Sequence, residues 1–417
     1  MGRGEKNSAA DLEVAVVGGS IAGCAVAIEL LRCGANVTLF ERSGDELKDR
    51  GAGLGIPFAA IEDFIARDLI DADIPYFPVH AFSRICRTPA EPRYGYLAWD
   101  QPASLAALNW GGLYRNLRKR VPDSIYRTHT GVCRLGQRGA DRVQLELIDG
   151  SRHEFDLVVC ADGYASLGRR TLFPDIDVNY AGYVLWRGFI DEATLGESPP
   201  LEQGIRCVGY PGGHGIFYFV PGANDSIARG ERLVNWGLYV PIADDELETF
   251  MRDKHGVQHV GSLPPGAMPL ATERRMKDLA RDVLPAYYAE IAERSADTFA
   301  YAIYDCPVPA YRRGRICLAG DAGAFARPHS AAGALKGLND AIALGDALTP
   351  GGDIDAALAA WNVERTEVNN NLVHFGNQLG QALVVDIPDW STMNVRDMEA
   401  WFNSIVTIKS DYIADRA

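Results

Sequence analysis

The residues that most constrain this fold stand near its start, where an apolar run meets a glycine-rich turn and an apolar helical stretch. Leu12 to Val17 is typical of a buried strand, and Ile21 to about Arg32 is typical of a helix that ends before Gly34. Ala35 to Glu41 predicts a second strand. A strand, a helix and a strand in this succession imply a parallel pair joined by a right-handed crossover. The sequence therefore predicts an α/β fold with a parallel sheet.

The turn between the first strand and the helix has the form G-x-S-x-x-G, Gly18-Gly19-Ser20-Ile21-Ala22-Gly23. Small residues here let the backbone N–H groups of the helix N-terminus face a pyrophosphate. Glu41 closes the second strand and can accept hydrogen bonds from a ribose diol, but it would repel a 2′-phosphate. The pattern predicts a Rossmann-like site for FAD or NAD, and the alternative is a tight turn without a ligand.

Two later segments repeat the pattern of a polar residue directly after a buried strand. Asp156 to Cys160 leads into Asp162-Gly163, within the pattern D-G-x-x-S-x-x-R that ends at Arg169. Arg315 to Ala319 leads into Gly320-Asp321. An aspartate at such a strand end can accept hydrogen bonds from ribose or ribitol, although Asp-Gly is also a common turn. The three elements in this order are more specific than any one of them.

Composition limits the classes of partner and compartment. Among 417 residues, 41 Lys and Arg stand against 55 Asp and Glu, and the net charge of −14 argues against a nucleic-acid binder. No apolar run approaches the roughly 18 residues of a spanning helix, so no membrane association is expected. The eight cysteines form no C-x-x-C pair and do not cluster with histidines, which favours free thiols in the cytoplasm and no metal site.

These motifs resemble the single-component FAD-dependent aromatic monooxygenases of the p-hydroxybenzoate hydroxylase group, over about residues 13–375. Three further segments resemble the dihydroxypyridine monooxygenases within that group: Tyr180 to Gly188, Gly213 to Tyr218 and Arg327 to Gly333. The resemblance implies a Rossmann-like FAD-binding domain with an interleaved β-rich substrate domain and a helical C-terminal region. The expected boundaries are a disordered leader over 1–12, the FAD-binding domain over 13–75, 105–175 and 305–350, the substrate domain over 76–104 and 176–304, and the C-terminal region over 351–417.

The resemblance also assigns residues to non-covalent FAD. It implies that Gly18, Ser20, Ile21, Ala22 and Gly23 hold the pyrophosphate. Around them, Glu41 would bind the adenosine ribose, Arg42 would lie near the adenine, Asp162 would serve FAD and NAD(P)H, Asp321 would bind the ribitol, and the loop with Pro328, Ala332 and Gly333 would lie against the isoalloxazine. The chain departs from the family in two places. Its flavin loop keeps one glycine of P-x-G-x-G, and Trp110 replaces an arginine for which Arg115 is the candidate substitute.

In this family NAD(P)H reduces FAD, O₂ adds at C4a, and the hydroperoxide transfers oxygen to an electron-rich ring. The chain is therefore expected to hydroxylate a phenol or a hydroxylated N-heterocycle, and a base that removes a phenolic proton is needed. His329 in the flavin loop and His214 in a glycine-rich turn are the candidate catalytic residues, although His214 could equally be an exposed hairpin residue. The candidate pocket residues are Tyr183, Tyr210, Tyr218 and Trp236, each of which could instead pack in the core, and Arg187 could bind either substrate or a carboxylate of the chain.

Two alternatives remain open from the sequence. One is an epoxidase or oxidative-cleavage enzyme of a natural-product pathway on the same scaffold, and the other is a non-catalytic flavin-binding sensor. The expected partner is a small aromatic substrate, and the expected state is a monomer or a homodimer.

Overall fold

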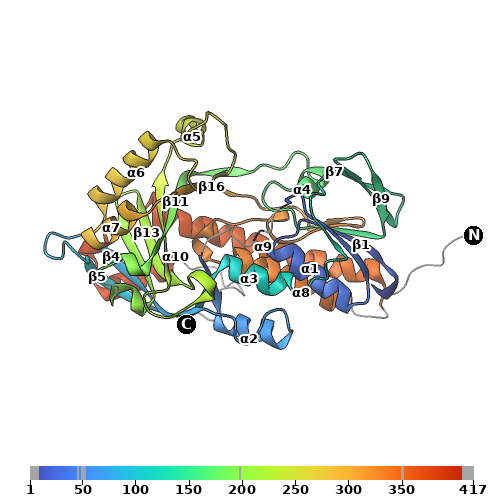
Figure 1. The fold of residues 1–417 in the computed structure, drawn as a ribbon, viewed down its shortest axis with the longest axis horizontal. Helices are drawn as coiled ribbons and strands as arrows, with labels where there is room; N and C mark the ends of the chain where they lie inside the picture. Colours follow the sequence, from blue (N-terminus) through green and yellow to red (C-terminus); the bar gives the residue numbers. More distant parts are fainter. Residues whose placement is uncertain (1–8, 45–46, 48–52, 197–198, 349–351, 406–417) are drawn as a thin grey trace, which may run out of the picture.

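The computed structural model describes residues 9–44, 47, 53–196, 199–348 and 352–405. Figure 1 shows an elongated molecule in which one sheet lies toward each end and the helix α9 (Ile354–Gly380) runs between them. The first sheet has the order β17-β18-β10-β1-β2-β6. Its strands are β1 (Glu13–Val17), β2 (Asn36–Phe40), β6 (Tyr126–Arg127), β10 (Leu157–Cys160), β17 (Arg312–Arg313) and β18 (Ile316–Leu318).

All strand pairs of this sheet are parallel except β17 with β18, which confirms the predicted parallel sheet. Strands from three separate stretches of the chain meet in it, since β10 and β18 both follow long insertions. The helix α1 (Ile21–Arg32) packs on α8 (Gly333–Ala347), where a Cβ at Gly337 would lie 3.0 Å from the Cβ of Ala22. A small antiparallel sheet, β7 (Val132–Arg138), β8 (Arg142–Leu147) and β9 (Arg152–Phe155), adjoins the first.

The second sheet has nine strands in the order β15-β16-β11-β14-β13-β12-β4-β5-β3. All neighbours are antiparallel except β12 with β4, so this sheet supplies the β-rich part of the fold that the resemblance implies. The strands are β3 (Gly53–Pro57), β4 (Phe77–Cys86), β5 (Tyr96–Asn109), β11 (Asn179–Asp191), β12 (Ile205–Tyr210), β13 (Gly213–Val220), β14 (Leu233–Pro241), β15 (Ser262–Leu263) and β16 (Phe299–Asp305).

The helix α1 has the bounds predicted from the sequence, Ile21 to Arg32. The remaining helices are α2 (Phe58–Ala66), α3 (Trp110–Arg118), α4 (Leu167–Leu172), α5 (Asp244–Phe250), α6 (Leu270–Val283), α7 (Ala286–Arg294) and α10 (Val395–Ile405). The helices α6 and α7 are separate because Leu284, before Pro285, takes an extended conformation.

The N-terminal residues 1–12 were expected to form a disordered leader. Residues 1–8 lie outside the described residues. Ala9–Asp11 form a short 3₁₀ helix, and the side chains of Ala9 and Leu12 are buried, so this end of the leader packs against the core. The domain boundaries themselves stay a prediction.

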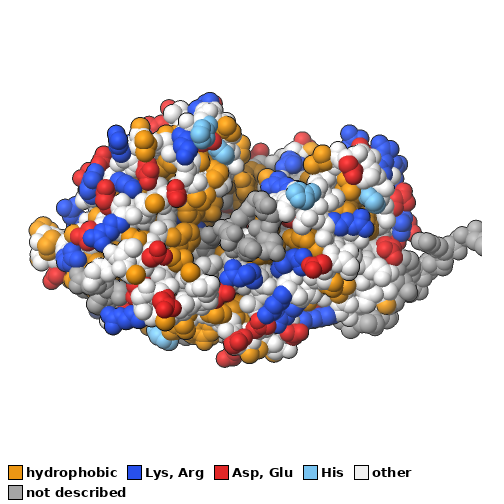
Figure 2. Space-filling model, in the orientation of Figure 1, with side chains coloured by type: hydrophobic (Ala, Val, Ile, Leu, Met, Phe, Trp, Pro, Cys, Tyr) orange, Lys and Arg blue, Asp and Glu red, His pale blue; other side chains and the backbone are white. Residues whose placement is uncertain are grey.

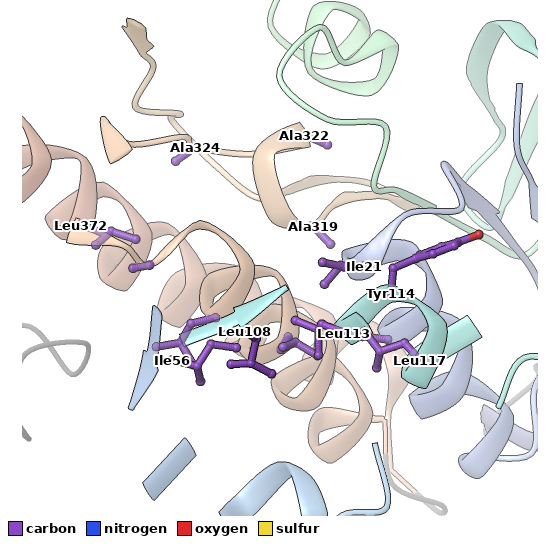
Figure 3. Packing of buried hydrophobic residues seen from close by; sticks show 14 of the residues in the cluster. Ile21, Ile56, Leu108, Leu113, Tyr114, Leu117, Ala319, Ala322, Ala324 and Leu372 are labelled. Atoms are coloured by element: carbon purple, nitrogen blue, oxygen red, sulfur yellow. The ribbon is translucent and has the colours of Figure 1, made fainter. Parts of the chain in front are cut away.

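One hydrophobic core joins the two sheets. Figure 3 shows Ile21 of α1, Ile56 of β3, Leu108 of β5, Leu113 of α3 and Leu372 of α9 converging in a single cluster. Because elements of both sheets contribute to this core, the space between the sheets has a fixed shape. No helix in the described part of the chain is long and apolar enough to cross a membrane. On the face seen in Figure 2, acidic and basic side chains are interspersed.

Candidate active site

A cavity of about 700 Å³ opens at the carboxyl ends of β1, β2 and β10. Ligands of parallel α/β sheets bind at this edge. The predicted cofactor residues that line the cavity are Gly18, Ser20, Ile21, Ala22, Glu41, Arg42, Asp162, Asp321 and Gly333. Trp110 lines it as well, whereas Gly23, Arg115, Pro328 and Ala332 do not.

The glycines of the first turn are needed because the backbone is crowded there. A Cβ at Gly18, whose φ is +101°, would lie 2.5 Å from the carbonyl oxygen of Ala161, and a Cβ at Gly23 would lie 1.8 Å from that of Gly18. Ser20 precedes α1 without making a side-chain capping hydrogen bond. The first amide groups of a helix have no partner within the helix and suit a pyrophosphate. The turn therefore fits the diphosphate of FAD.

Glu41 is held rigidly at the end of β2. Its Oε2 accepts a hydrogen bond from the amide of Gly19 at 2.7 Å, and its Oε1 accepts one from the amide of Ser43 at 2.8 Å. Each carboxylate oxygen can accept a further hydrogen bond. The geometry fits a carboxylate that receives the hydroxyl groups of a ribose.

Arg169, which was not among the predicted site residues, connects the two aspartate elements. Its Nη1 donates to the carbonyl oxygens of Asp321 at 2.9 Å and Ala322 at 3.1 Å. Asp162 Oδ2 accepts from the amide of Leu167 at 2.6 Å, which fixes the start of α4. Arg169, the last residue of the pattern D-G-x-x-S-x-x-R, thus holds the turn at Asp321 in place. The pattern could have identified this role from the sequence.

A buried ion pair supports the same turn from α8, and the sequence analysis did not identify it. Lys336 Nζ donates to the carbonyl oxygen of Gly320 at 2.6 Å and lies 3.1 Å from Asp340 Oδ2. Asp340 accepts from the amide of Gly320 at 2.9 Å. Burial raises the pKa of Asp321, and the charges of Lys336 and Arg169 partly offset this rise. Lys336 and Asp340 are four residues apart in an otherwise apolar helix, and this spacing could have indicated the ion pair from the sequence.

A second cavity of about 290 Å³ adjoins the first. Leu54, Asp321, Gly333 and Ala334 line both, so the two cavities meet at these residues. Besides Asp321 and Gly333, the predicted residues that line the second cavity are Pro328, Arg187, His214, His329 and Tyr218.

The other predicted pocket residues do not line this cavity. Trp236 faces the core, where its Nε1 donates to Ser295 Oγ at 2.7 Å. Tyr210 Oη donates to the carbonyl oxygen of Tyr239 at 2.8 Å. Tyr183 lies behind residues that line the cavity, since it contacts His329, Tyr239 and Arg327.

His329 lies at the centre of an aromatic cluster in the second cavity. Its Nε2 is 2.9 Å from Tyr183 Oη, and its Nδ1 is buried with no hydrogen-bond partner. The ring of Tyr239 lies 4.2 Å from the ring of His329 and 4.6 Å from that of His214, measured between centroids. His214 Nδ1 donates to the carbonyl oxygen of Leu383 at 3.0 Å. Tyr239 was missed because its strand position alone does not indicate which face of the sheet it occupies.

Burial keeps both histidines neutral. It lowers the pKa of His214 to about 3, with a smaller contribution from the positive charge of Arg84. The pKa of His329 falls well below its ordinary value, first because of burial and then because of His214 and Arg327. Burial raises the pKa of Tyr183 to about 12, so its hydroxyl keeps its proton. The cluster is therefore a set of uncharged hydrogen-bonding groups at neutral pH.

Arg115 lies away from both cavities. Its Nη2 pairs with Asp225 Oδ1 at 2.5 Å, and neither residue lines the space between the sheets. Trp110 stacks on Tyr114 with 5.5 Å between ring centroids. At the position where the family has an arginine, this chain thus has Trp110, which forms an aromatic pair with Tyr114.

Known proteins share this sequence pattern. A family model described as FAD binding domain-like matches residues 180–305. The 2,6-dihydroxypyridine 3-monooxygenase of Paenarthrobacter nicotinovorans is 27% identical over 362 residues, which cover 85% of this chain and 87% of that protein. Salicylate hydroxylase of Pseudomonas putida is 28% identical over 385 residues, covering 84% of this chain and 80% of that protein. This chain is an FAD-dependent monooxygenase.

Solved structures support the fold of this monooxygenase. The structure of 2,6-dihydroxypyridine-3-hydroxylase from Arthrobacter nicotinovorans has a TM-score of 0.81 at 24% identity and covers 91% of this chain and 94% of its own. A salicylate hydroxylase substrate complex has a TM-score of 0.72 at 21% identity and covers 98% of both chains. The predicted p-hydroxybenzoate hydroxylase type of fold and the predicted FAD cofactor are confirmed. These relatives do not favour the non-catalytic sensor.

Proposed function

We propose that this monooxygenase hydroxylates a single electron-rich aromatic ring, a phenol or a hydroxylated N-heterocycle, held in the 290 Å³ cavity. An apolar cavity of about 150 Å³ accepts benzene, so there is room for one ring with substituents. The named relatives support the class, since one acts on a dihydroxypyridine and the other on salicylate.

The single observation that carries the proposal is the state of His329. Its imidazole is neutral, and Nε2 is occupied by Tyr183. When Nε2–H donates to the tyrosine oxygen, Nδ1 carries the lone pair and has no partner within the chain. We infer that Nδ1 accepts the proton of the ring hydroxyl. Loss of this proton raises the electron density of the ring, which an electrophilic oxygen requires.

When bound, FAD takes electrons from NAD(P)H and supplies activated oxygen derived from O₂. The chain contributes binding, orientation and exclusion of water. Its predicted cofactor residues would hold FAD along the larger cavity, from Glu41 at one end to Asp321 and Gly333 where the cavities meet. Leu372 and Leu379 of α9, with Leu383, form an apolar wall of the smaller cavity that keeps water from the reacting centre.

His214 and Tyr183 are proposed to position His329. His214 is fixed by the carbonyl of Leu383 and stacks on Tyr239, which packs against His329. Tyr183 fixes the orientation of the His329 ring through its hydroxyl group, which lies 2.9 Å from Nε2. His214 also remains the second candidate for proton transfer, since both histidines line the cavity.

The proposal also covers the domain division, the compartment and the oligomeric state. The predicted domain division is supported by the two sheets, although β3, from within the expected FAD-binding segment 13–75, joins the edge of the second sheet. We propose that the enzyme is cytoplasmic, because all eight cysteines are free and seven of them are buried, as expected in a reducing compartment. Its proposed state is a monomer or a homodimer.

The test follows NADH and NADPH oxidation in air by the FAD-loaded enzyme with a panel of phenols and hydroxypyridines. At least one ring should stimulate oxidation and gain a hydroxyl group. His329→Ala should lower kcat by at least about 100-fold at neutral pH with unchanged flavin content. The deficit should shrink as the pH rises through the pKa of the free phenol, because the ring then arrives deprotonated.

The matched control is His255→Ala, which removes an exposed histidine far from both cavities. A kcat of His329→Ala equal to that of this control would remove His329 from the mechanism. No response to any aromatic ring, together with oxygen transfer to an isolated alkene, would favour the epoxidase or oxidative-cleavage alternative.

A further inference from the structure

Arg84 is a buried cation in the substrate cavity without a carboxylate partner. It lies on β4, its exposed fraction is 5%, and it lines the 290 Å³ cavity. Its Nη2 donates to Gln101 Oε1 at 3.0 Å, and its Nε has no hydrogen-bond partner. No acidic residue within the described part of the chain forms an ion pair with it. A buried charge in this state is costly unless a ligand completes it.

Aromatic rings contact the guanidinium. Its central carbon lies 5.4 Å from the ring centroid of Phe402, 5.8 Å from that of Trp390 and 6.0 Å from that of Phe82. Phe402 and Phe82 also line the cavity. Cation–π contact offsets part of the desolvation cost and orients the planar group, but it does not satisfy its N–H donors.

The charges around the cavity are unbalanced. Lys336 is neutralised by Asp340, and Arg327 by Asp305. Within the described part of the chain, Arg187 donates to the amide oxygen of Asn235 and forms no ion pair. Among the described residues that line the cavity, the one carboxylate is Asp321, which lies at the opening toward the FAD cavity. The substrate end of the cavity therefore carries uncompensated positive charge.

We propose that Arg84 is a specificity-determining residue that binds a carboxylate on the aromatic ring, so that the substrate is a hydroxylated aromatic acid. The inference rests on the proposed function, since it places the substrate ring in the same cavity. A guanidinium matches a carboxylate with two parallel hydrogen bonds, which anchors the ring in one orientation. Arg84 is preferred to Arg187 because Arg187 is only partly buried.

The test measures binding to the FAD-loaded enzyme at pH 7.5 by calorimetry, with benzoate and its neutral isostere benzamide as probes. The wild-type enzyme should bind benzoate at least about 30-fold more tightly than benzamide. Arg84→Met should reduce this ratio to about threefold or less. Arg84→Lys, which keeps the charge without the planar fork, should give an intermediate ratio.

Arg206→Met is the matched control. Arg206 is also 5% exposed and forms no ion pair with a carboxylate among the described residues, and it lies on the neighbouring strand β12, but it does not line the cavity. This variant should keep the wild-type ratio. If Arg84→Met does not bind FAD or fold, Arg84→Lys and Gln101→Leu replace it, and both should lower the ratio. A wild-type ratio near one, or loss of the preference in Arg187→Met but not in the Arg84 variants, would overturn the proposal.

The outcomes separate this inference from the proposed function. Binding of benzoate that depends on Arg84, without hydroxylation of any ring, would leave the anion site standing and remove the hydroxylase proposal. Hydroxylation of neutral phenols or hydroxypyridines without any preference for a carboxylate would remove the Arg84 proposal alone.

Discussion

Acid should destabilise this monooxygenase through His214 by an amount that can be worked out from its burial. Its side chain is 3% exposed, and its pKa in the folded protein is about 3 against 6.5 for an ordinary histidine. Below pH 6.5 the unfolded chain therefore binds a proton that the folded chain excludes. The stability from this residue is complete above pH 6.5 and is lost as the pH falls, by about 1.4 kcal/mol per pH unit. Between pH 7.5 and pH 5 the loss amounts to about 2 kcal/mol.

The measurement compares wild-type and His214→Leu proteins by urea unfolding at several pH values between 5 and 7.5, with FAD in equal excess. The substitution has a pH-independent cost from lost packing and from the unsatisfied carbonyl of Leu383. The titration of His214 is therefore measured by how the difference in unfolding free energy between the two proteins changes with pH. Wild type should lose about 2 kcal/mol more than the variant on going to pH 5. A difference that stays constant across this range would show that His214 is not a buried neutral histidine.

Two further predictions concern FAD and stability. Gly23→Val should abolish FAD binding, because its Cβ would lie 1.8 Å from the carbonyl oxygen of Gly18, whereas Gly136→Ala, with open space around it, should keep a normal flavin-to-protein absorbance ratio. Equal flavin content in the two variants would contradict the crowded turn. Lys336→Met should lower the free energy of unfolding by up to about 3–5 kcal/mol, because it removes the nearer of the two cations beside the buried Asp340 and leaves only Arg365, 3.8 Å from the other carboxylate oxygen, among the described residues. Adding Asp340→Asn should restore part of that loss in urea unfolding, and no restoration would argue against the ion pair.

The cofactor cavity could be predicted from the sequence because its residues are local. Gly18 to Gly23 form one turn, and Glu41 follows the next strand, so the crossover geometry alone brings them together. Asp162 and Asp321 join them because each follows a strand of the same parallel sheet, β10 or β18. The fold class followed from the same periodicities.

The substrate cavity could be predicted only in part, because it depends on pairings between distant strands. Trp236 and Tyr239 are both aromatic residues of β14, but they are three residues apart and so point to opposite faces. Trp236 packs against Trp186 at 4.7 Å between centroids, whereas Tyr239 faces His329. Arg84 was missed for the same reason, since its place in the cavity depends on β4 pairing with β12, more than a hundred residues later in the chain.

The central claim is that an aromatic ring in the smaller cavity receives one oxygen atom from O₂ while His329 takes up its proton. The most direct measurement incubates the FAD-loaded enzyme with NADH or NADPH and isotopically labelled O₂ over a panel of hydroxylated aromatic rings. The account predicts a product with one labelled oxygen on the ring, formed in step with NAD(P)H oxidation and suppressed in His329→Ala. NAD(P)H oxidation that yields only hydrogen peroxide with every ring, or a label that comes from water, would contradict it.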